Sequence, residues 1–315
     1  MVFMLLIVIY HAYMHGDVAM EDICLMGQSL DSLRHWAFLM VGKCGVTGFI
    51  FISGYYGLKF RKEKLWDMLF MCVFYYFVSL LLNPGACSLK MMLHPWDMWW
   101  FMSCYMLLYT LSPVIEAGIK AVEKKTFLFI VFMMVVYEYW GHFFGCNNDH
   151  DFPLLLTVYI VARYLRLHVN TQLPSPNTRY RRPYLCAIAL LSLLAMVVTP
   201  MALSLVGLER CCSVFMSNNN ILILTLSASL VILMTGVVFH SRIINYLSSS
   251  MLAVYLITDG SLREVIDPWL EEQMLQSWMG YIYAIALLLA CVMVDKLRAI
   301  LFTLILRLTP SNFRG

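Results

Sequence analysis

Charged residues are scarce in this chain of 315 residues. Asp, Glu, Lys and Arg together make up 13% of it, whereas 61% of the residues are hydrophobic. Soluble domains contain about a quarter charged residues, and a soluble fold of this length needs them to cover its surface. The shortage therefore excludes an ordinary soluble protein and indicates that lipid surrounds most of the chain.

Patterns typical of secretion and of metal binding are also missing. The first residues are apolar, without the basic stretch and cleavage site of a signal peptide. The ten cysteines follow no zinc or haem spacing and indicate no disulfide framework. His11 and His15 share one helix face, but two histidines without a third ligand make a poor metal site. We therefore expect no bound metal and no permanently bound cofactor.

Long apolar runs dominate what is present. A helix needs about 20 apolar residues to cross a bilayer, and fewer where the bilayer is thinned. Such runs predict an all-α, polytopic integral membrane protein with about ten transmembrane helices. The expected spans are 1–14, 44–58, 65–82, 98–115, 126–140, 153–168, 184–206, 220–239, 247–258 and 278–294.

The positions of the basic residues support this threading. With the N-terminus in the cytoplasm, only five of the 22 basic residues fall in outward loops. These five are Arg34, Lys43, Lys90, Arg210 and Arg263. An excess of Lys and Arg in cytoplasmic loops is the positive-inside rule. We therefore expect both termini to lie in the cytoplasm.

The chain is predicted to form a single transmembrane domain over residues 1–315. After Val294, residues 295–308 alternate basic side chains with leucine and isoleucine. That pattern favours a helix in the cytoplasmic membrane interface, where its arginines contact lipid phosphates.

The ionisable side chain of His11 lies within the first expected span. Such groups are costly in a membrane and tend to face the bundle interior, a polar cavity or a partner. Two interpretations remain open, a functional histidine and a histidine that only hydrogen-bonds to another helix.

Small residues and cations follow one another at the end of the second expected span. Ser53 and Gly54 let helices approach closely, and packing is the commoner role of such residues in membranes. Lys59 and Arg61 follow, and they fit either a ligand site or the positive-inside rule alone. Trp100, near the start of the fourth span, fits an interfacial aromatic belt.

The order of these motifs resembles the acyltransferase-3 family of bacterial membrane O-acyltransferases. The resemblance covers nearly the whole chain. It rests on Val8–His11, on Gly45–Tyr55 with Lys59, and on Trp99–Met102 through Pro113. Weaker similarities lie at Tyr159–Arg166, Asn218–Asn220 and Leu252–Ile257.

The resemblance implies transfer of an acyl group, often acetyl, from cytoplasmic acyl-CoA to a hydroxyl of a surface or exported glycan. It implies His11 as the catalytic residue, and Ser53, Gly54, Tyr55 and Trp100 as motif and packing residues. The family motif also places an arginine before this histidine, with ten residues between the two, and this arginine falls one position before Met1. We therefore expect upstream coding sequence that supplies this arginine.

The chemistry of the reaction suggests roles for these residues. A histidine, with a pKa near 6.5, suits the task of taking a proton from a hydroxyl; an acyl-histidine intermediate is the alternative. Cations suit the phosphates of CoA. Lys59 and Arg61 are the first candidates for binding acyl-CoA, ahead of Arg179, Arg181 and Arg182.

The expected partners follow from the same resemblance. They are membrane lipids, acyl-CoA and a glycan or lipid-linked glycan, with no nucleic acid, and the expected location is the bacterial cytoplasmic (inner) membrane. A competing function is a transporter or flippase in which His11 relays protons. A glycan polymerase is a further alternative, although it would be expected to have a larger outer loop than the longest one here, residues 16–43.

Overall fold

Every element that the computed structural model describes is a helix. It describes residues 1–14, 30–93, 98–141, 144, 150–169, 181–207, 214–215, 217–237, 240–266 and 279–308. The contacts divide the chain into two compact units. Unit 1 comprises Met1, Phe60–Met106 and Ser241–Gly315, and unit 2 comprises Val2–Lys59 and Leu107–His240.

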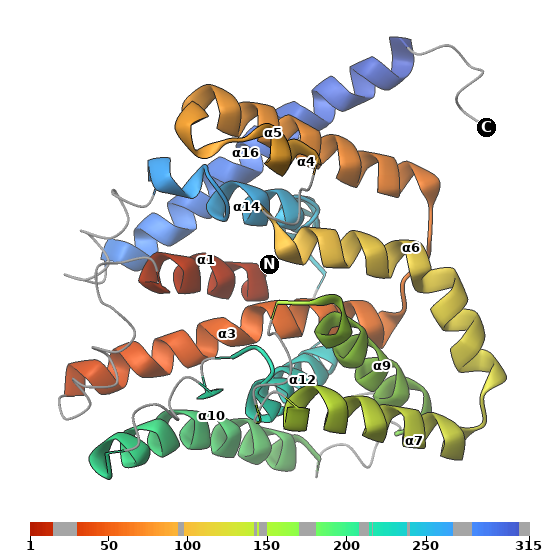
Figure 1. The fold of residues 1–315 in the computed structure, drawn as a ribbon, viewed down its shortest axis with the longest axis vertical. Helices are drawn as coiled ribbons and strands as arrows, with labels where there is room; N and C mark the ends of the chain where they lie inside the picture. The colour runs from red at the N-terminus through yellow and green to blue at the C-terminus, as the bar shows by residue number, and fades with distance from the viewer. Residues whose placement is uncertain are drawn as a thin grey trace. The chain divides into compact units, whose positions relative to one another are not determined.

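Unit 2 is built around α3 (Figure 1). Its described helices are α1 (Val2–Met14), α3 (Leu30–Tyr56), the part of α6 (Trp100–Ala121) after Met106, α7 (Lys124–Val135), the π-helical η3 (Val136–Trp140), α9 (Phe152–His168), α10 (Arg181–Leu205) and α12 (Ile221–Thr235). The helices α1, α9, α10 and α12 all contact α3. Because α3 is contacted on several sides, most of its segment Leu39–Tyr56 is buried.

A hydrophobic core joins α3 to α10 and α12. Its fully buried members include Met40, Cys44, Met196 and Ile223. Trp36 also belongs to this core, and its indole nitrogen donates a hydrogen bond to the Met196 carbonyl at 2.9 Å. A buried indole that finds a carbonyl partner adds specificity to a core that is otherwise apolar.

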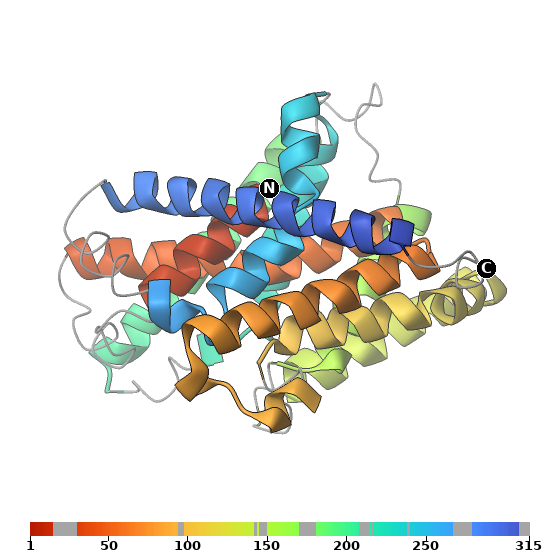
Figure 2. The same ribbon diagram turned by 90° about the horizontal axis from the view of Figure 1, so that it is seen from above.

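Unit 1 is built from α4, α14 and α16 with shorter elements at their ends (Figure 2). Its described helices are α4 (Lys62–Leu82), the 3-10 helix η1 (Pro84–Ala86), α5 (Leu89–Leu93), the first turns of α6, α13 (Arg242–Ser248), α14 (Met251–Thr258) and α16 (Met279–Leu308). Both α4 and α14 contact α16.

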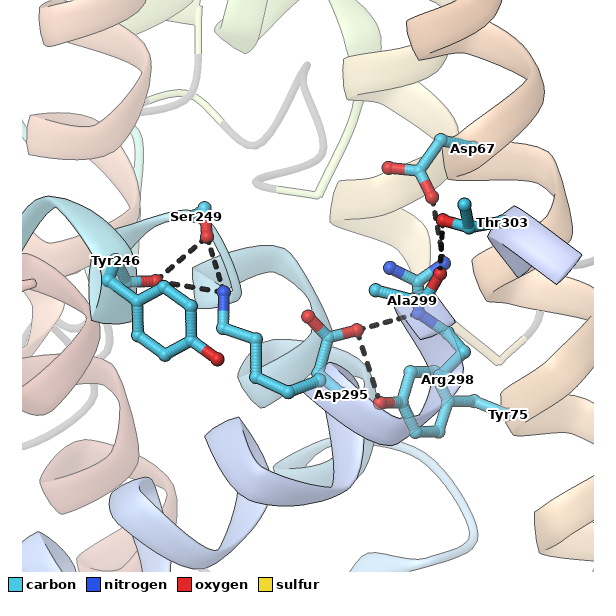
Figure 3. A network of polar contacts seen from close by, with 9 residues as sticks. Asp67, Tyr75, Tyr246, Ser249, Asp295, Arg298, Ala299 and Thr303 are labelled. Carbon is cyan, nitrogen blue, oxygen red and sulfur yellow. Dashed lines mark hydrogen bonds and ion pairs between the residues drawn. The ribbon is translucent and has the colours of Figure 1, made fainter. Parts of the chain in front are cut away.

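A buried ionic network ties α16 to α4 in unit 1 (Figure 3). Arg298, only 3% exposed, pairs with Asp295 at 2.6 Å and with Asp67 at 2.8 Å. The Tyr75 hydroxyl donates to the same Asp295 carboxylate at 3.5 Å. Two carboxylates compensate one guanidinium, as a buried charge requires. The interfacial position of 295–308 stays a prediction, but Arg298 is turned into the protein.

Four described helices are long and apolar enough to cross a membrane. They are Leu39–Tyr56, Lys62–Leu82, Trp100–Ala121 and Arg182–Leu203. Val2–His11 and Ile221–Thr235 are apolar but shorter. On α4, large apolar side chains at helical spacing are exposed, among them Trp66, Val73, Phe77 and Leu81. Such a stripe is costly in water and stable in lipid, so the chain is a membrane protein, and the count of ten spans remains a prediction.

The observed helices differ from the expected spans in several places, and α6 and α16 extend to Ala121 and Leu308, past the expected ends at 115 and 294. The helix α3 begins at Leu30 rather than near residue 44. Polar residues lower the hydropathy of its first half, so the apolar run did not include it. The expected ninth span, 247–258, is interrupted by a turn at Ser249 and Ser250, so that α14 has only 8 residues. Elsewhere α1, α4, α9 and α10 match the expected ranges to within a few residues.

Candidate active site

Glycines on α3 bring α1 into close contact. A side chain at Gly42 would meet the Tyr10 Cβ atom at 2.7 Å, and residues at Gly45 and Gly48 would meet Ile7 and Phe3. Residue numbers increase along α3 while the numbers of their contacts on α1 decrease, so the two helices are antiparallel. This packing role of small residues is the one expected in membranes. It places His11 beside the first half of α3.

A buried cation lies near His11. The His11 ring is 6.0 Å from the Tyr10 ring, measured between centroids. The Lys43 ammonium nitrogen lies 4.9 Å from the centroid of the same Tyr10 ring, and Lys43 is only 7% exposed. His11 itself is half-buried. Tyr10 therefore links an imidazole and an ammonium group on neighbouring helices.

Lys43 lies in a different place from the one expected. The threading placed it in an outward loop, but it lies inside α3 and is buried. The available signal was a lone cation between Val41 and Cys44 in an apolar stretch. Buried ionisable residues in membrane helices mark functional sites by default. We name Tyr10, His11 and Lys43 the histidine cluster.

The C-terminal end of α3 packs closely against α9. A Cβ atom at Gly54 would lie 2.5 Å from the Tyr159 carbonyl oxygen and 2.9 Å from the Ala162 Cβ atom. Ser53 is half-buried, and its hydroxyl donates to the Phe49 carbonyl within α3. In this structure both residues therefore serve helix structure and packing, which is one of the roles expected for the motif.

The backbone turns sharply directly after α3. Gly57 has a φ of +77°, in the left-handed region that side chains disfavour, and the Arg163 guanidinium would lie 3.1 Å from a Cβ atom there. The Leu58 amide donates to the Tyr159 hydroxyl at 3.1 Å. The Tyr109 hydroxyl donates to the Lys59 carbonyl at 3.0 Å. We name the segment Gly57–Lys59 the corner.

An acidic residue on α6 holds the corner's supports together. The Tyr159 hydroxyl donates to Glu116 at 2.6 Å, and Arg163 pairs with the other oxygen of this carboxylate at 2.7 Å. The side chains of Arg163 and Glu116 are only 11% and 16% exposed. Charge-assisted bonds of this kind are short and strong. The corner is therefore fixed from α6 and α9 before any ligand arrives.

Only part of this arrangement is visible in the sequence. Tyr159 and Arg163 fall within one of the weaker similarities to the family, but no motif singles out Glu116 or Tyr109. The signal for Glu116 was an acidic residue in the last turns of an otherwise apolar helix. Its partners lie more than 40 residues away in sequence, so periodicity could not reveal them.

Cations project from the corner and from α9. The Lys59 side chain is exposed, while its carbonyl oxygen accepts the hydrogen bond from Tyr109. Arg166 is half-buried, and its guanidinium carbon lies 5.0 Å from the centroid of the Tyr55 ring. One Arg166 nitrogen also donates to the Tyr55 hydroxyl at 3.5 Å. Tyr55, which is fully buried, thus serves as the platform on which Arg166 rests.

The remaining predicted cations lie elsewhere. Arg61 is exposed and precedes α4 without a side-chain cap, and the boundary between the two units falls between it and Lys59. Arg182 is exposed and donates to the Gly236 carbonyl at 3.1 Å. Arg181 begins α10, and Arg179 and His15 lie outside the described residues.

The neighbouring tryptophans Trp99 and Trp100 lie in different surroundings. Trp100 is half-buried and packs edge-on against Phe101. The neighbouring Trp99 is 1% exposed, and its indole nitrogen donates to the carbonyls of Leu256 and Asp259 at 3.1 and 3.3 Å. Trp99 therefore fixes the end of α14 within unit 1.

The histidine cluster lies beside the middle of α3, and the corner follows its C-terminal end. Gly42, beside Tyr10, and Tyr56, before the corner, are separated by about 20 Å at 1.5 Å per residue. A single small ligand does not reach both places. Among the described residues, no three His, Cys, Asp or Glu side chains are grouped closely enough to hold a metal ion.

Comparison with known proteins gives one match. The family model described as an acyltransferase domain, that of the acyltransferase-3 family, matches residues 1–295. This range includes the histidine cluster, the corner and every support of the corner. No curated protein and no solved structure shows significant similarity to the chain.

Proposed function

Because the chain belongs to the acyltransferase-3 family, we propose that it transfers an acyl group, normally acetyl, from cytoplasmic acyl-CoA to a hydroxyl of a surface or exported glycan. The family match supports an acyltransferase activity as such. The donor, the acyl chain and the acceptor belong to the proposal.

One observation carries the proposal, namely the separation of the corner from the histidine cluster along α3. Acyl-CoA is a long molecule whose phosphates and thioester lie at opposite ends of the extended pantetheine arm. A ligand of this kind needs cations at one end of its site and an acid–base group far away at the other. The pair formed by Lys59 and His11 meets that requirement.

The reaction then proceeds by direct transfer. His11 accepts the proton of the acceptor hydroxyl while the oxygen forms a bond to the acyl carbonyl carbon. The carbon–sulfur bond breaks, and the departing thiolate receives the proton from the imidazolium. Lys43 contributes a positive charge near this exchange, where low polarity strengthens electrostatic interactions.

The donor phosphates bind at the corner in this proposal. Lys59 is exposed, Arg61 follows it two residues later in the sequence, and Arg166 on α9 lies over the ring of Tyr55. Cations bind phosphate oxygens through charge-assisted hydrogen bonds. Because Glu116 already compensates the charge of Arg163, the exposed Lys59 is the better candidate for binding a ligand that must also be released.

The proposed orientation places the corner in the cytoplasm of a bacterial inner membrane, with both termini on the same side. Reporter fusions after Lys64 and Lys125 should then give cytoplasmic signals, and a fusion near His94 an exterior signal. An exterior signal after Lys64 would reverse the orientation and would separate the corner from its cytoplasmic donor.

Radiolabelled acetyl-CoA tests the activity directly. Purified protein in lipid is incubated with labelled acetyl-CoA and a mixture of glycans from the cell surface. We expect label on a glycan and release of free CoA in equal amount. Transport of unlabelled glycan across the membrane with no label transferred would support a flippase instead.

A further inference from the structure

A small cavity in unit 1 lies beyond the end of α14. Its volume is about 260 Å³, and its lining residues are Met91, Met98, Asp259, Gly260, Ser261, Arg263 and Glu264. Sites for whole drug-sized ligands span about 300–1,000 Å³. The cavity therefore has room for one ring of a larger ligand, and not for a molecule the size of acyl-CoA.

The inner wall of the cavity is fixed by packing. Gly260 has a φ of +77°, and a Cβ atom there would lie 2.9 Å from the Trp99 indole nitrogen and 3.0 Å from the Met98 Cγ atom. The same indole nitrogen donates to the carbonyls of Leu256 and Asp259. Residue 260 must therefore be glycine or the wall must move.

The rim of the cavity is held by a polar clamp. The Asn83 side-chain amide donates to the Ser261 carbonyl at 3.2 Å and to a Glu264 carboxylate oxygen at 2.7 Å. The Cys87 and Ser261 side chains are also within hydrogen-bonding distance, at 3.5 Å. Glu264 is exposed, so its orientation is set by Asn83 while it remains accessible to a ligand.

The chemistry of the lining excludes two classes of ligand. Asp259 and Glu264 outnumber the single cation Arg263, so an anionic group such as a phosphate meets net negative charge. A purely apolar ligand would remove these charged groups from water without giving them partners. A neutral ligand with many hydroxyl groups meets neither objection.

We propose that this cavity is the subsite for one neutral sugar ring of the acceptor glycan. Carboxylates accept hydrogen bonds from sugar hydroxyls, and the Arg263 guanidinium and the Ser261 hydroxyl donate to them. The thioether side chains of Met91 and Met98 cover the apolar C–H face of the ring. This inference rests on the proposed function, because it assigns the acceptor of that reaction.

The position of the cavity in the sequence agrees with this assignment. Its residues come from the segment after α4 and the segment after α14, and the threading places both segments on the exterior face. An exported or surface glycan is accessible there. The structure brings these segments together through Asn83 and Trp99, although they are more than 150 residues apart in sequence.

Direct binding tests the subsite without requiring catalysis. The protein is placed in phosphatidylcholine nanodiscs, since many detergents carry a sugar headgroup, and titrated calorimetrically with methyl glucoside, methyl galactoside and N-acetylglucosamine. Inorganic phosphate serves as the anionic comparison. We expect saturable binding of at least one sugar and none of phosphate. No saturable binding of any sugar, or tighter binding of phosphate, would overturn the assignment.

Two variants locate the binding. Glu264→Gln and Arg263→Gln should each weaken binding of the preferred sugar about 10-fold, the usual effect of removing one charge-assisted hydrogen bond. Glu63→Gln alters an exposed carboxylate in the first turn of α4 and should leave binding unchanged. Wild-type affinity in both cavity variants would place the sugar elsewhere and refute the proposal.

Kinetics separates this inference from the proposed function. Where acyl transfer occurs, the cavity variants should raise the KM for the glycan and leave the KM for acyl-CoA unchanged. If the cavity variants transfer acyl groups with an unchanged KM for the glycan, the sugar subsite is refuted while the proposed function stands. Sugar binding that the variants weaken, in a protein that transfers no acyl group, would support a sugar site and refute the proposed function.

Discussion

The middle of α3 and the corner that follows its C-terminal end hold cations in opposite environments. Near Gly42, Lys43 is 7% exposed and lies over the ring of Tyr10, close to His11. After Gly57, Lys59 is exposed on a corner whose backbone is bound by Tyr109 and Tyr159. Close packing surrounds Lys43 and hydrogen bonds hold the corner, but only the corner presents its charge to water.

This difference separates binding from chemistry. An exposed cation exchanges water for a phosphate at little cost, so it binds a charged ligand and releases it. A buried cation acts in a medium of low polarity, where its field is stronger and no solvent has to reorganise. We therefore expect changes at the corner to alter the KM for acyl-CoA and changes in the histidine cluster to alter kcat.

Replacing His11 should give the largest effect. His11→Ala should reduce kcat by about 10²–10⁴, the usual value of general acid–base catalysis, with folding and membrane insertion near normal. His240→Ala, at an exposed position, is the matched control and should retain activity. If His11 were only an interhelical hydrogen-bond partner, its loss should cost about 1 kcal/mol of stability. A folded His11→Ala protein with near-normal turnover would refute the mechanism.

Removing the charge of Glu116 should loosen the corner. Glu116→Gln leaves Arg163 without its carboxylate, and a charged hydrogen bond of this kind contributes about 2 kcal/mol. We expect a lower melting temperature and a higher KM for acyl-CoA with a nearly unchanged kcat. Glu123→Gln, at an exposed residue whose side chain makes no cap bond, should change neither. A stable variant with a wild-type KM would show that the network does not position Lys59.

A methyl group added between α3 and α9 tests their close packing. Gly54→Ala should destabilise the protein by about 1–3 kcal/mol through overpacking against Tyr159 and Ala162. Gly118→Ala is the control, because no atom lies within 4 Å of a Cβ atom there, and alanine favours a helix by up to about 1 kcal/mol. Thermal unfolding of both variants in lipid measures the difference. Equal melting temperatures would contradict the packing role of Gly54.

Truncating Lys59 should have the smallest effect, expressed as a change in the free energy of acyl-CoA binding. Lys59→Ala should raise the KM for acyl-CoA about 10-fold, which corresponds to about 1.4 kcal/mol, and should leave kcat and stability close to wild type. Arg61→Ala should change the KM in the same direction. Lys125→Ala removes an exposed cation in the first turn of α7 and should have no effect. An unchanged KM for acyl-CoA after the double replacement of Lys59 and Arg61 would show that the donor binds elsewhere.

Much of the helical framework was predictable from local sequence. Apolar runs located α1, α4, α9 and α10 to within a few residues, since a helix that contacts lipid must be apolar along its length. The first half of α3 was missed because Asp31 and Arg34 lower its hydropathy. A helix that packs against protein does not need to be apolar on every face.

The candidate site was predictable only where a residue is unusual in its own segment. His11 stands out because it is ionisable within an apolar run, and the family resemblance added Lys59 and the glycine motif. Lys43 was misplaced because its burial depends on α1, which packs against α3 through glycines. The fold rather than the local sequence decides whether such a cation faces water or protein.

The sequence by itself determined that the chain is an apolar, all-helical membrane protein of the acyltransferase-3 family with a histidine in its first helix. Only the tertiary structure decided that Glu116 joins Tyr159 to Arg163, and that Asn83 and Trp99 shape the cavity beyond α14. The physical reason is the range of the interactions. Hydropathy is a property of consecutive residues, whereas burial and charge pairing depend on segments that folding brings together.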